Sequence, residues 1–121
     1  MQDVRLGAVE ARFADIVWNR APMSTRELVE ASAAELSWKR TTTYTVLKKL
    51  CERGLFETKD STVTVLVERD EFYAMQSEKF VEDTFEGSLP AFLAAFSKRK
   101  KYTSEEVERM KQILDSMKGE L

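Results

Sequence analysis

The stretch WKRTTTYTVLKKLCERGLF, residues 38–56, decides how the rest of the chain is interpreted. On a wheel of 3.6 residues per turn, one arc of this stretch collects the side chains that must be buried: Thr43, Val46, Leu47, Leu50 and Cys51. Gly54 follows at the position where helices commonly end with a residue in the left-handed conformation. The stretch therefore predicts one amphipathic helix that is closed by Gly54.

The opposite face of this helix carries hydroxyls and amines, and its first two turns lack a carboxylate. Thr41, Thr45, Lys48 and Lys49 form this polar face, and Thr42 and Tyr44 flank it. In a helix that enters a groove of DNA, hydroxyls reach base edges or phosphates and amines neutralise phosphates. A solvated helix surface is the alternative for such a face on its own, so its meaning depends on the surrounding elements.

Two helical patterns precede this stretch. Residues 6–18 carry an amphipathic series formed by Leu6, Val9, Phe13, Ile16 and Val17. After a break around Pro22, Ser24 and Glu27 form a capping box that opens a second helix, whose apolar side consists of Leu28, Val29 and Leu36. Trp38 is expected to anchor the corner before the third helix. Three helices with a short turn before a polar-faced third helix are typical of a helix-turn-helix.

Two β-prone runs follow the third helix, at residues 55–59 and 62–67, with Asp60-Ser61 between them. Such a small hairpin must pack on the helices, and it corresponds to the wing of a winged helix. Lys59 is its one lysine that can lie over a phosphate. The predicted fold is mainly α with a small β-hairpin: a winged helix-turn-helix domain at residues 1–69, followed by a helical dimerisation region at residues 70–121.

The second region is predicted to contain three helices. Residues 69–86 form a long helix closed by Gly87, and Ser88 begins another helix that has Pro90 in its first turn. A basic linker at residues 97–102 leads to a capping box of Thr103 and Glu106, which opens a last helix that we expect to end at Gly119.

These helices carry more apolar surface than a small winged helix can cover. Soluble monomers avoid large exposed apolar patches, and a symmetric dimer buries such a patch against its own copy. A dimer also places two third helices on a palindromic site. The residues expected at the dimer interface are Phe80, Phe85, Leu89, Phe92, Leu93, Phe96, Val107, Met110, Leu114 and Met117.

Composition narrows the function further. The 121 residues include no histidine, one cysteine and four glycines, so the usual general bases, metal clusters, disulfides and glycine-rich phosphate loops are not available. We therefore expect neither an enzyme nor a bound metal or cofactor. The formal net charge is −2, yet residues 37–59 hold six basic and two acidic side chains. No signal peptide or membrane-spanning run is visible, and the predicted location is the cytoplasm.

Taken together, these residues resemble the penicillinase-repressor family (BlaI/MecI/CopY type) of winged-helix transcriptional regulators. The resemblance extends from Leu6 to Met117 and rests on the order of several short motifs. These are Val17-Trp18 at the end of the first helix, Trp38, the pattern Thr-x-x-x-Leu-x-x-Leu-x-x-x-Gly-Leu at residues 43–55, Leu-x-x-Phe at residues 93–96, and Ser-Glu-Glu at residues 104–106.

The resemblance implies a dimeric repressor whose C-terminal helices form the dimer. Its base-contacting positions fall on Thr41, Thr42, Tyr44 and Thr45, and phosphate contacts would come from Lys48, Lys49 and the wing. With Lys39 and Arg40 ahead of the helix and Lys59 in the hairpin, these are the predicted DNA-binding residues. The hairpin is shorter than the wing that the resemblance implies.

Two branches of that family respond to different signals. In the antibiotic-responsive branch, a membrane sensor triggers proteolysis in the dimerisation region, and the matching bond here is Ala95–Phe96. The copper-responsive branch uses a C-terminal cysteine cluster, which this sequence lacks. The expected partners are therefore double-stranded operator DNA, a second copy of the chain and a regulatory protease, without membrane insertion.

Two other functions compete with this interpretation. A winged helix without DNA binding could hold a protein partner through its aromatic C-terminal helices, and the negative net charge and the short wing favour that alternative. A carboxylate-based hydrolase would need two close acidic side chains in a cleft, and the sequence offers no such pair.

Overall fold

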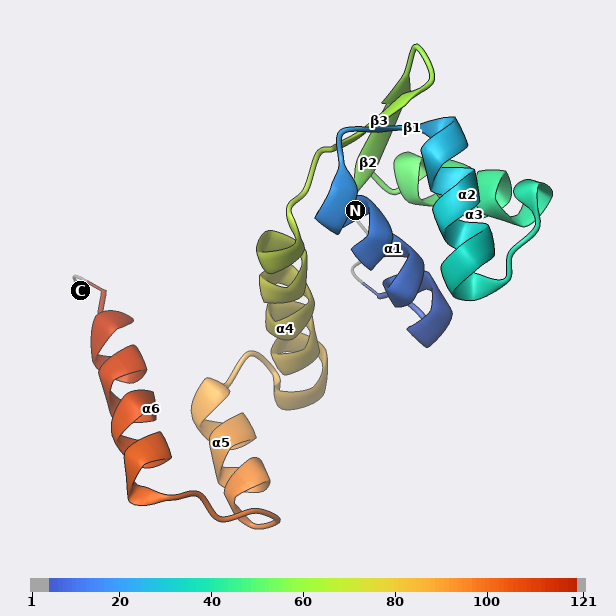
Figure 1. Ribbon diagram of the computed structural model, residues 1–121. Coiled ribbons are helices and arrows are strands. Elements are labelled where there is room, and N and C mark those ends of the chain that lie inside the picture. The colour runs from blue at the N-terminus through green and yellow to red at the C-terminus, as the bar shows by residue number, and fades with distance from the viewer. Residues whose placement is uncertain (1–4, 120–121) are drawn as a thin grey trace. The chain divides into compact units, whose positions relative to one another are not determined.

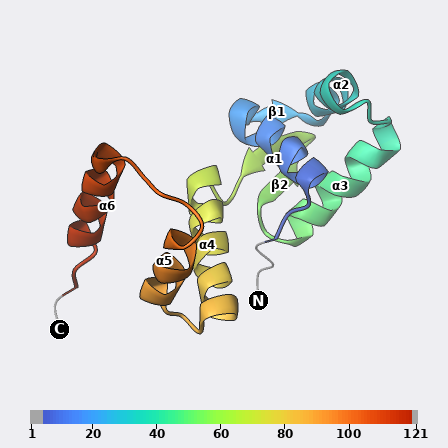
Figure 2. The same cartoon turned by 90° about the horizontal axis from the view of Figure 1, so that it is seen from below.

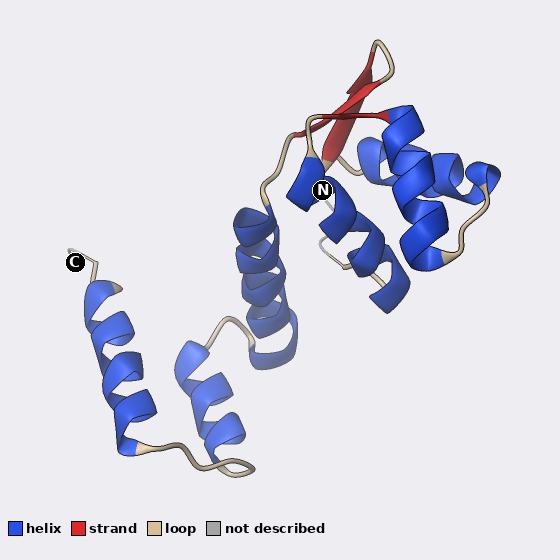
Figure 3. Cartoon of the chain, viewed as in Figure 1, coloured by secondary structure: helices blue, strands red, loops and turns tan. Residues whose placement is uncertain are grey.

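The computed structural model describes residues 5–119, and these contain six helices and three strands (Figures 1 and 3). The elements in chain order are α1 (Ala8–Arg20), β1 (Met23–Ser24), α2 (Thr25–Leu36), α3 (Arg40–Glu52), β2 (Phe56–Lys59), β3 (Thr62–Val65), α4 (Arg69–Phe85), α5 (Leu89–Ser97) and α6 (Ser104–Ser116). The predicted class, mainly helical with a small antiparallel hairpin, is confirmed.

The described residues divide into two compact units on either side of the bond between Phe80 and Val81. The helix α4 runs across this division, so its first three turns belong to the first unit. Phe72, in the first turn of α4, is fully buried there. By contacts, the first unit thus reaches beyond residue 69, where the sequence places the end of the winged helix.

The core of the first unit is built by α1, α2, α3, the sheet and the start of α4. In this unit α1 packs on α2, and α2 packs on α3 (Figures 1 and 2). Its fully buried large side chains include Phe13, Val17, Leu28, Leu50, Leu55, Phe56, Val63 and Phe72. Val9 was expected on this apolar stripe, but it is 50% exposed because it lies in the first turn of α1, before the buried set begins.

The sheet has three strands in the order β1-β3-β2, and both pairs are antiparallel. The predicted hairpin is present, with Phe56 opposite Val65 and Lys59 opposite Thr62. Asp60 and Ser61 both have positive φ, at 51° and 59°, as a two-residue turn that matches the strand twist requires. The sequence did not predict β1, because two residues cannot display an alternating pattern.

The third helix begins at Arg40, two residues after the start of the quoted stretch. Trp38 lies before it and stacks on Phe13, with ring centroids 5.2 Å apart, so its predicted role as a corner anchor is supported. Gly54 has a φ of 83°, which explains glycine at this position. On the inner arc Thr43, Leu47 and Leu50 are buried, while Val46 and Cys51 are only partly buried against the core.

The second unit contains the end of α4 with α5 and α6. Ser88 and Thr103 cap α5 and α6 as predicted, and the Thr103 hydroxyl accepts the backbone N–H of Glu106 at 3.1 Å. The prediction that Gly119 ends the last helix is wrong. The helix stops at Ser116, because the N–H of Met117 donates to the Leu114 carbonyl and closes the final turn without glycine.

Candidate nucleic-acid interface

All of the predicted contact residues are exposed, and most of them lie on the outer face of α3. The exposed side chains on or beside this helix are Lys39, Arg40, Thr41, Thr42, Tyr44, Thr45, Lys48 and Lys49, and Lys59 is exposed in β2. Because Thr43, Leu47 and Leu50 fix the opposite side of the helix in the core, this face has one orientation on the first unit. The structure therefore brings seven of the nine predicted residues together on α3, with Lys39 at its N-cap and Lys59 in the hairpin.

The first two turns of α3 organise their own polar groups. The Thr45 hydroxyl donates to the Thr41 carbonyl at 2.9 Å, so the Thr45 oxygen remains available as an acceptor. The Arg40 guanidinium lies over the Tyr44 ring, 5.4 Å from its centroid. This cation–π contact holds a long basic side chain and an aromatic ring at the start of the helix.

Lys48 and Lys49 differ although they are neighbours. Lys49 Nζ lies 3.2 Å from Glu10 Oε2, and Glu10 Oε1 accepts the backbone N–H of Gly7 at 3.1 Å. The N–H of Gly7 lowers the pKa of Glu10 below its usual value, and Lys49 adds to this effect, while burial opposes it. Lys48 is exposed and makes no ion pair within residues 5–119. Lys48 is thus the freer of the two cations for a phosphate.

A depression lies between the start of α2, the hairpin turn and the first turn of α3. Its lining includes Arg26, Arg40, Tyr44 and Ser61, and the Ser61 carbonyl accepts the N–H of Thr25 at 3.0 Å. Arg26, which the sequence analysis did not select, is exposed there, and its Nε lies 3.4 Å from Oε1 of Glu30, which lines the same depression. Its place inside the capping box of the second helix, between Ser24 and Glu27, was the signal that could have identified it.

The hairpin itself has little positive charge. Lys59 is exposed at the end of β2, but Glu57 and Asp60 are exposed on the same hairpin. The hydrogen bond between the Ser61 carbonyl and Thr25 also ties the turn to the start of α2. Any electrostatic contact of the hairpin with a polyanion therefore depends on Lys59 alone.

The second unit exposes an apolar surface. Among the described residues 81–119 none is fully enclosed, and Leu93, Phe96, Leu114 and Met117 are among the exposed side chains. A cavity of about 610 Å³ is lined by Phe92, Leu93, Phe96, Ser97, Lys100, Lys101, Tyr102, Val107 and Met110. Ile113, which is 60% exposed, was not predicted, although it lies three residues after Met110 and so on the same side of α6.

The predicted interface residues differ in their surroundings: some contact one another through their rings, and others are exposed. Phe85 and Phe92 meet edge to face at 5.6 Å, and Phe92 stacks on Phe96 at 5.7 Å. The ring of Phe96 in turn stacks on Tyr102 at 6.1 Å. Leu89, Val107 and Met110 are partly or largely exposed in α5 and α6. Phe80 is 51% exposed, and it belongs to the first unit.

Three further features concern metal ligands, the cysteine and the length of the helices. In the part of the chain that the structure describes, no group of three metal-ligating side chains occurs. Cys51 is partly buried, and its sulfur lies 3.5 Å from the Thr58 hydroxyl. None of the helices between residues 5 and 119 combines the length and apolar character that crossing a bilayer needs.

A winged helix that presents an exposed, hydroxyl- and amine-rich third helix defines a class of protein, the DNA-binding transcription regulators. The sequence profile of the penicillinase repressor family matches residues 6–116, and the chain belongs to this family. It is 20% identical over 114 residues to the methicillin resistance regulatory protein MecI of Staphylococcus aureus (strain Mu50 / ATCC 700699), covering 91% of this chain and 93% of that protein. It is 21% identical over 119 residues to the penicillinase repressor of Bacillus licheniformis, covering 95% and 93%. The family is one of repressors rather than enzymes.

Proposed function

We propose that this protein is a cytoplasmic repressor that binds a palindromic operator as a homodimer. In this proposal residues 1–69 contact DNA and residues 70–121 form the dimer. The observation that carries the proposal is the outer face of α3, where seven exposed polar or basic side chains share one helix whose other side is fixed in the core. The family membership supports the same function.

The proposed contacts divide by chemistry. Thr41, Thr42, Tyr44 and Thr45 lie in the first turns of α3 and would reach base edges in the major groove. Basic side chains on α3, at the start of α2 and in the hairpin would contact phosphates, which position the helix without reading sequence: Arg26, Lys39, Arg40, Lys48, Lys49 and Lys59.

The proposed dimer rests on the second unit. Its aromatic and aliphatic side chains are left largely exposed within one chain, and a second copy would cover them. A two-fold dimer presents two copies of α3, so the matching operator is a palindrome with its half-sites about one helical turn apart.

The experiment that tests the function is a gel shift on promoter DNA beside the gene, run at two salt concentrations. If the dimer neutralises about six phosphates, the slope of log K against log salt should be about −5. Absence of a shift, or a shift that does not change with salt, would refute DNA binding through this face.

We further propose that the repressor is inactivated by proteolysis between Ala95 and Phe96, triggered by a membrane sensor. This bond lies in the last turns of α5, where the N–H groups of Lys98 and Arg99 donate to the carbonyls of Ala95 and Phe96 at 3.3 and 3.1 Å. Cleavage would require these turns to unwind. Protein that stays intact after exposure of cells to the inducing stress would contradict this step.

Two observations favour a second function. The exposed charges Glu57 and Asp60 on the hairpin and the net charge of −2 suit a winged helix that holds a protein partner through its C-terminal helices. A purified monomer that does not shift promoter DNA would favour this function. A stable dimer that shifts it would exclude the alternative.

A further inference from the structure

Glu10 of α1 and Lys49 of α3 form an ion pair beside the outer face of α3. Lys49 Nζ lies 3.2 Å from Glu10 Oε2, and both helices belong to the first unit. Lys49 follows Thr45 by four residues, so these two exposed side chains are neighbours on the surface of α3. A carboxylate therefore occupies a lysine directly beside the hydroxyls that are proposed to contact bases.

Glu10 is held by its own helix as well as by Lys49. Its second oxygen, Oε1, accepts the backbone N–H of Gly7 at 3.1 Å, as the third residue of a helix does when it caps the first turn. This N–H lowers the pKa of Glu10, burial opposes the effect, and the charges of Lys49 and Arg53 lower the pKa further. The Glu10 side chain is 23% exposed and that of Lys49 is 60% exposed. Glu10 is thus the fixed, ionised partner and Lys49 the flexible one.

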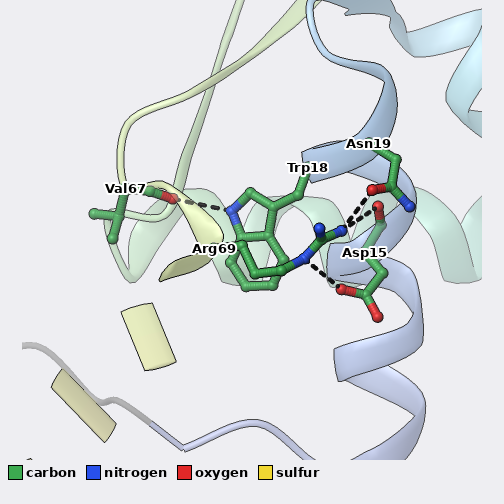
Figure 4. Close-up of polar contacts among 5 residues, drawn as sticks. All are labelled: Asp15, Trp18, Asn19, Val67 and Arg69. Carbon is green, nitrogen blue, oxygen red and sulfur yellow. Dashed lines mark hydrogen bonds and ion pairs between the residues drawn. The ribbon is translucent and has the colours of Figure 1, made fainter. Parts of the chain in front are cut away.

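The helix that carries Glu10 is itself anchored in the first unit. Arg69 Nε donates to Asp15 Oδ1 at 3.1 Å, and the indole N–H of Trp18 donates to the Val67 carbonyl at 2.9 Å (Figure 4). These bonds tie α1 to the segment that follows β3. Because α1 is anchored, its carboxylate cannot follow a lysine side chain that turns away toward another anion.

A DNA phosphate and Glu10 would compete for the single charge of Lys49. A lysine that neutralises a phosphate releases a counterion, which favours binding and makes it depend on salt. Lys49 can make this contact only after leaving the carboxylate, so the loss of the ion pair offsets part of the gain. Since phosphate contacts carry no sequence information, this offset lowers the affinity for every sequence alike.

We propose that Glu10 is an intramolecular competitor of DNA, which limits the affinity of the outer face of α3 by occupying Lys49. This proposal rests on the proposed repressor function and adds a control to it. The side chains at the start of α3 decide which sequence is bound, and Glu10 lowers the part of the affinity that all sequences share.

The test compares variants of the full chain on two duplexes, an operator that the wild type selects from a randomised pool and an unrelated sequence. The Kd is measured at several salt concentrations, and urea unfolding checks that each variant is folded. Glu10→Gln removes the charge but keeps an acceptor for Gly7, and it is combined with Lys49→Ala in a double-mutant cycle. Glu35→Gln is the matched control, because it removes the same charge from an ion pair with Arg20 that joins α1 to α2.

We expect Glu10→Gln to bind both duplexes about two- to fivefold more tightly for each copy of α3, the range that corresponds to an exposed ion pair. The salt dependence should become steeper by about one for each bound chain, because one more phosphate is neutralised. In the Lys49→Ala background, Glu10→Gln should change neither quantity. Glu35→Gln should bind like the wild type.

The outcomes separate this role from two others. Tighter binding with a steeper salt dependence, both lost when Lys49 is absent, supports the proposal. Unchanged or weaker binding of Glu10→Gln overturns it, because the ion pair then only joins two helices. An equal gain in the Lys49→Ala background also overturns it, since Glu10 would then repel DNA without acting through Lys49. A loss of affinity in Lys49→Ala as large as that in Lys48→Ala contradicts it independently of any Glu10 variant. If the wild type binds neither duplex, the proposed function itself fails, and the role of Glu10 falls with it.

Discussion

The two compact units of this chain differ in how far they bury their apolar side chains. In the described part of the chain, every buried apolar side chain lies before Phe80, where helices, strands and the start of α4 enclose Phe13, Phe56 and Phe72 completely. Between residues 81 and 119 no side chain is enclosed, although Phe92 and Phe96 stack on one another. The first unit thus encloses its apolar side chains within one chain, and the second leaves them exposed within one chain, as the proposed dimer would require.

Under the proposed function, this difference would assign DNA binding and dimerisation to separate parts of the molecule. A rigid, self-contained unit can hold the polar face of α3 in one orientation, which base recognition needs. An incomplete apolar unit can supply association, and its loss would separate two DNA-binding units without unfolding them. The following predictions test this division, from the largest expected effect to the smallest.

Removal of a core ring from the first unit should have the largest effect. Phe72 is fully buried beside Trp18 and Tyr73, so Phe72→Ala should lower the free energy of unfolding by about 3–5 kcal/mol. Urea unfolding followed by tryptophan fluorescence measures this change. A loss below about 1 kcal/mol would show that α4 does not belong to the core of the winged helix.

The matching change in the second unit should act on association instead. Phe96 is 46% exposed within one chain, and Phe96→Asp would place a charge in the proposed interface. We expect the dimer to weaken by at least about 2 kcal/mol, the size typical of a central interface residue. Gln112→Asp, an exposed change of the same charge on α6, should leave the dimer intact. Sedimentation velocity distinguishes these outcomes. A dimer that survives Phe96→Asp would contradict the proposal that the second unit forms the dimer.

Sequence preference should depend on the start of α3. Thr41→Ala or Thr45→Ala should alter the preference among base pairs by about 1–3 kcal/mol at the contacted position, and binding to unrelated DNA should stay the same. Binding to a panel of single-base variants of the selected operator gives this profile. Equal losses on all sequences would show that these hydroxyls contact phosphates and do not contact bases.

Neighbouring lysines should differ in their effect on DNA affinity. Lys48→Ala should weaken binding to all sequences and lower the steepness of the salt dependence by about one. Lys49→Ala should have a smaller effect, since Lys49 already pairs with Glu10. Binding isotherms at three salt concentrations measure both slopes. A larger change for Lys49 than for Lys48 would contradict the division of roles inferred from the ion pair.

The smallest effect concerns pH. The pKa of Glu10 is lowered in the folded protein, so its contribution to stability is fully present above the ordinary carboxylate pKa and is lost as the pH falls through the lowered value. Glu10→Gln keeps a side-chain acceptor for Gly7 but removes the charge. The free energy of unfolding, measured by urea titration at each pH, should be higher for the wild type than for this variant by about 1 kcal/mol or less at pH 7. This difference should shrink toward pH 3. A difference that is constant with pH would exclude the carboxylate as its source.

Local signals in the sequence were sufficient for most of the fold. The capping boxes at Ser24 and Thr103 and the turn at Asp60-Ser61 each combine residues close in sequence, so their geometry follows from local chemistry. The helical spacing of apolar residues around Thr43 and Leu47 likewise predicted which side of α3 is buried. The outer face of α3, and with it most of the candidate site, was visible for the same reason.

Contacts between distant residues could not be predicted in this way. The pairing of Arg69 with Asp15 joins positions 54 residues apart, and the pairing of Lys49 with Glu10 joins separate helices. Strand β1 is only two residues long, and its pairing with β3 is what defines it. These features depend on tertiary packing, and periodicity within one element carries no information about them.

The most direct test of the central claim is the mass of the complex on DNA. Sedimentation of the full chain with a palindromic duplex that it selects should show two 13.9 kDa chains per duplex, and the Phe96→Asp variant should bind the same duplex far more weakly while its winged helix stays folded. A complex with one chain per duplex, or a variant that binds as tightly as the wild type, would contradict the account.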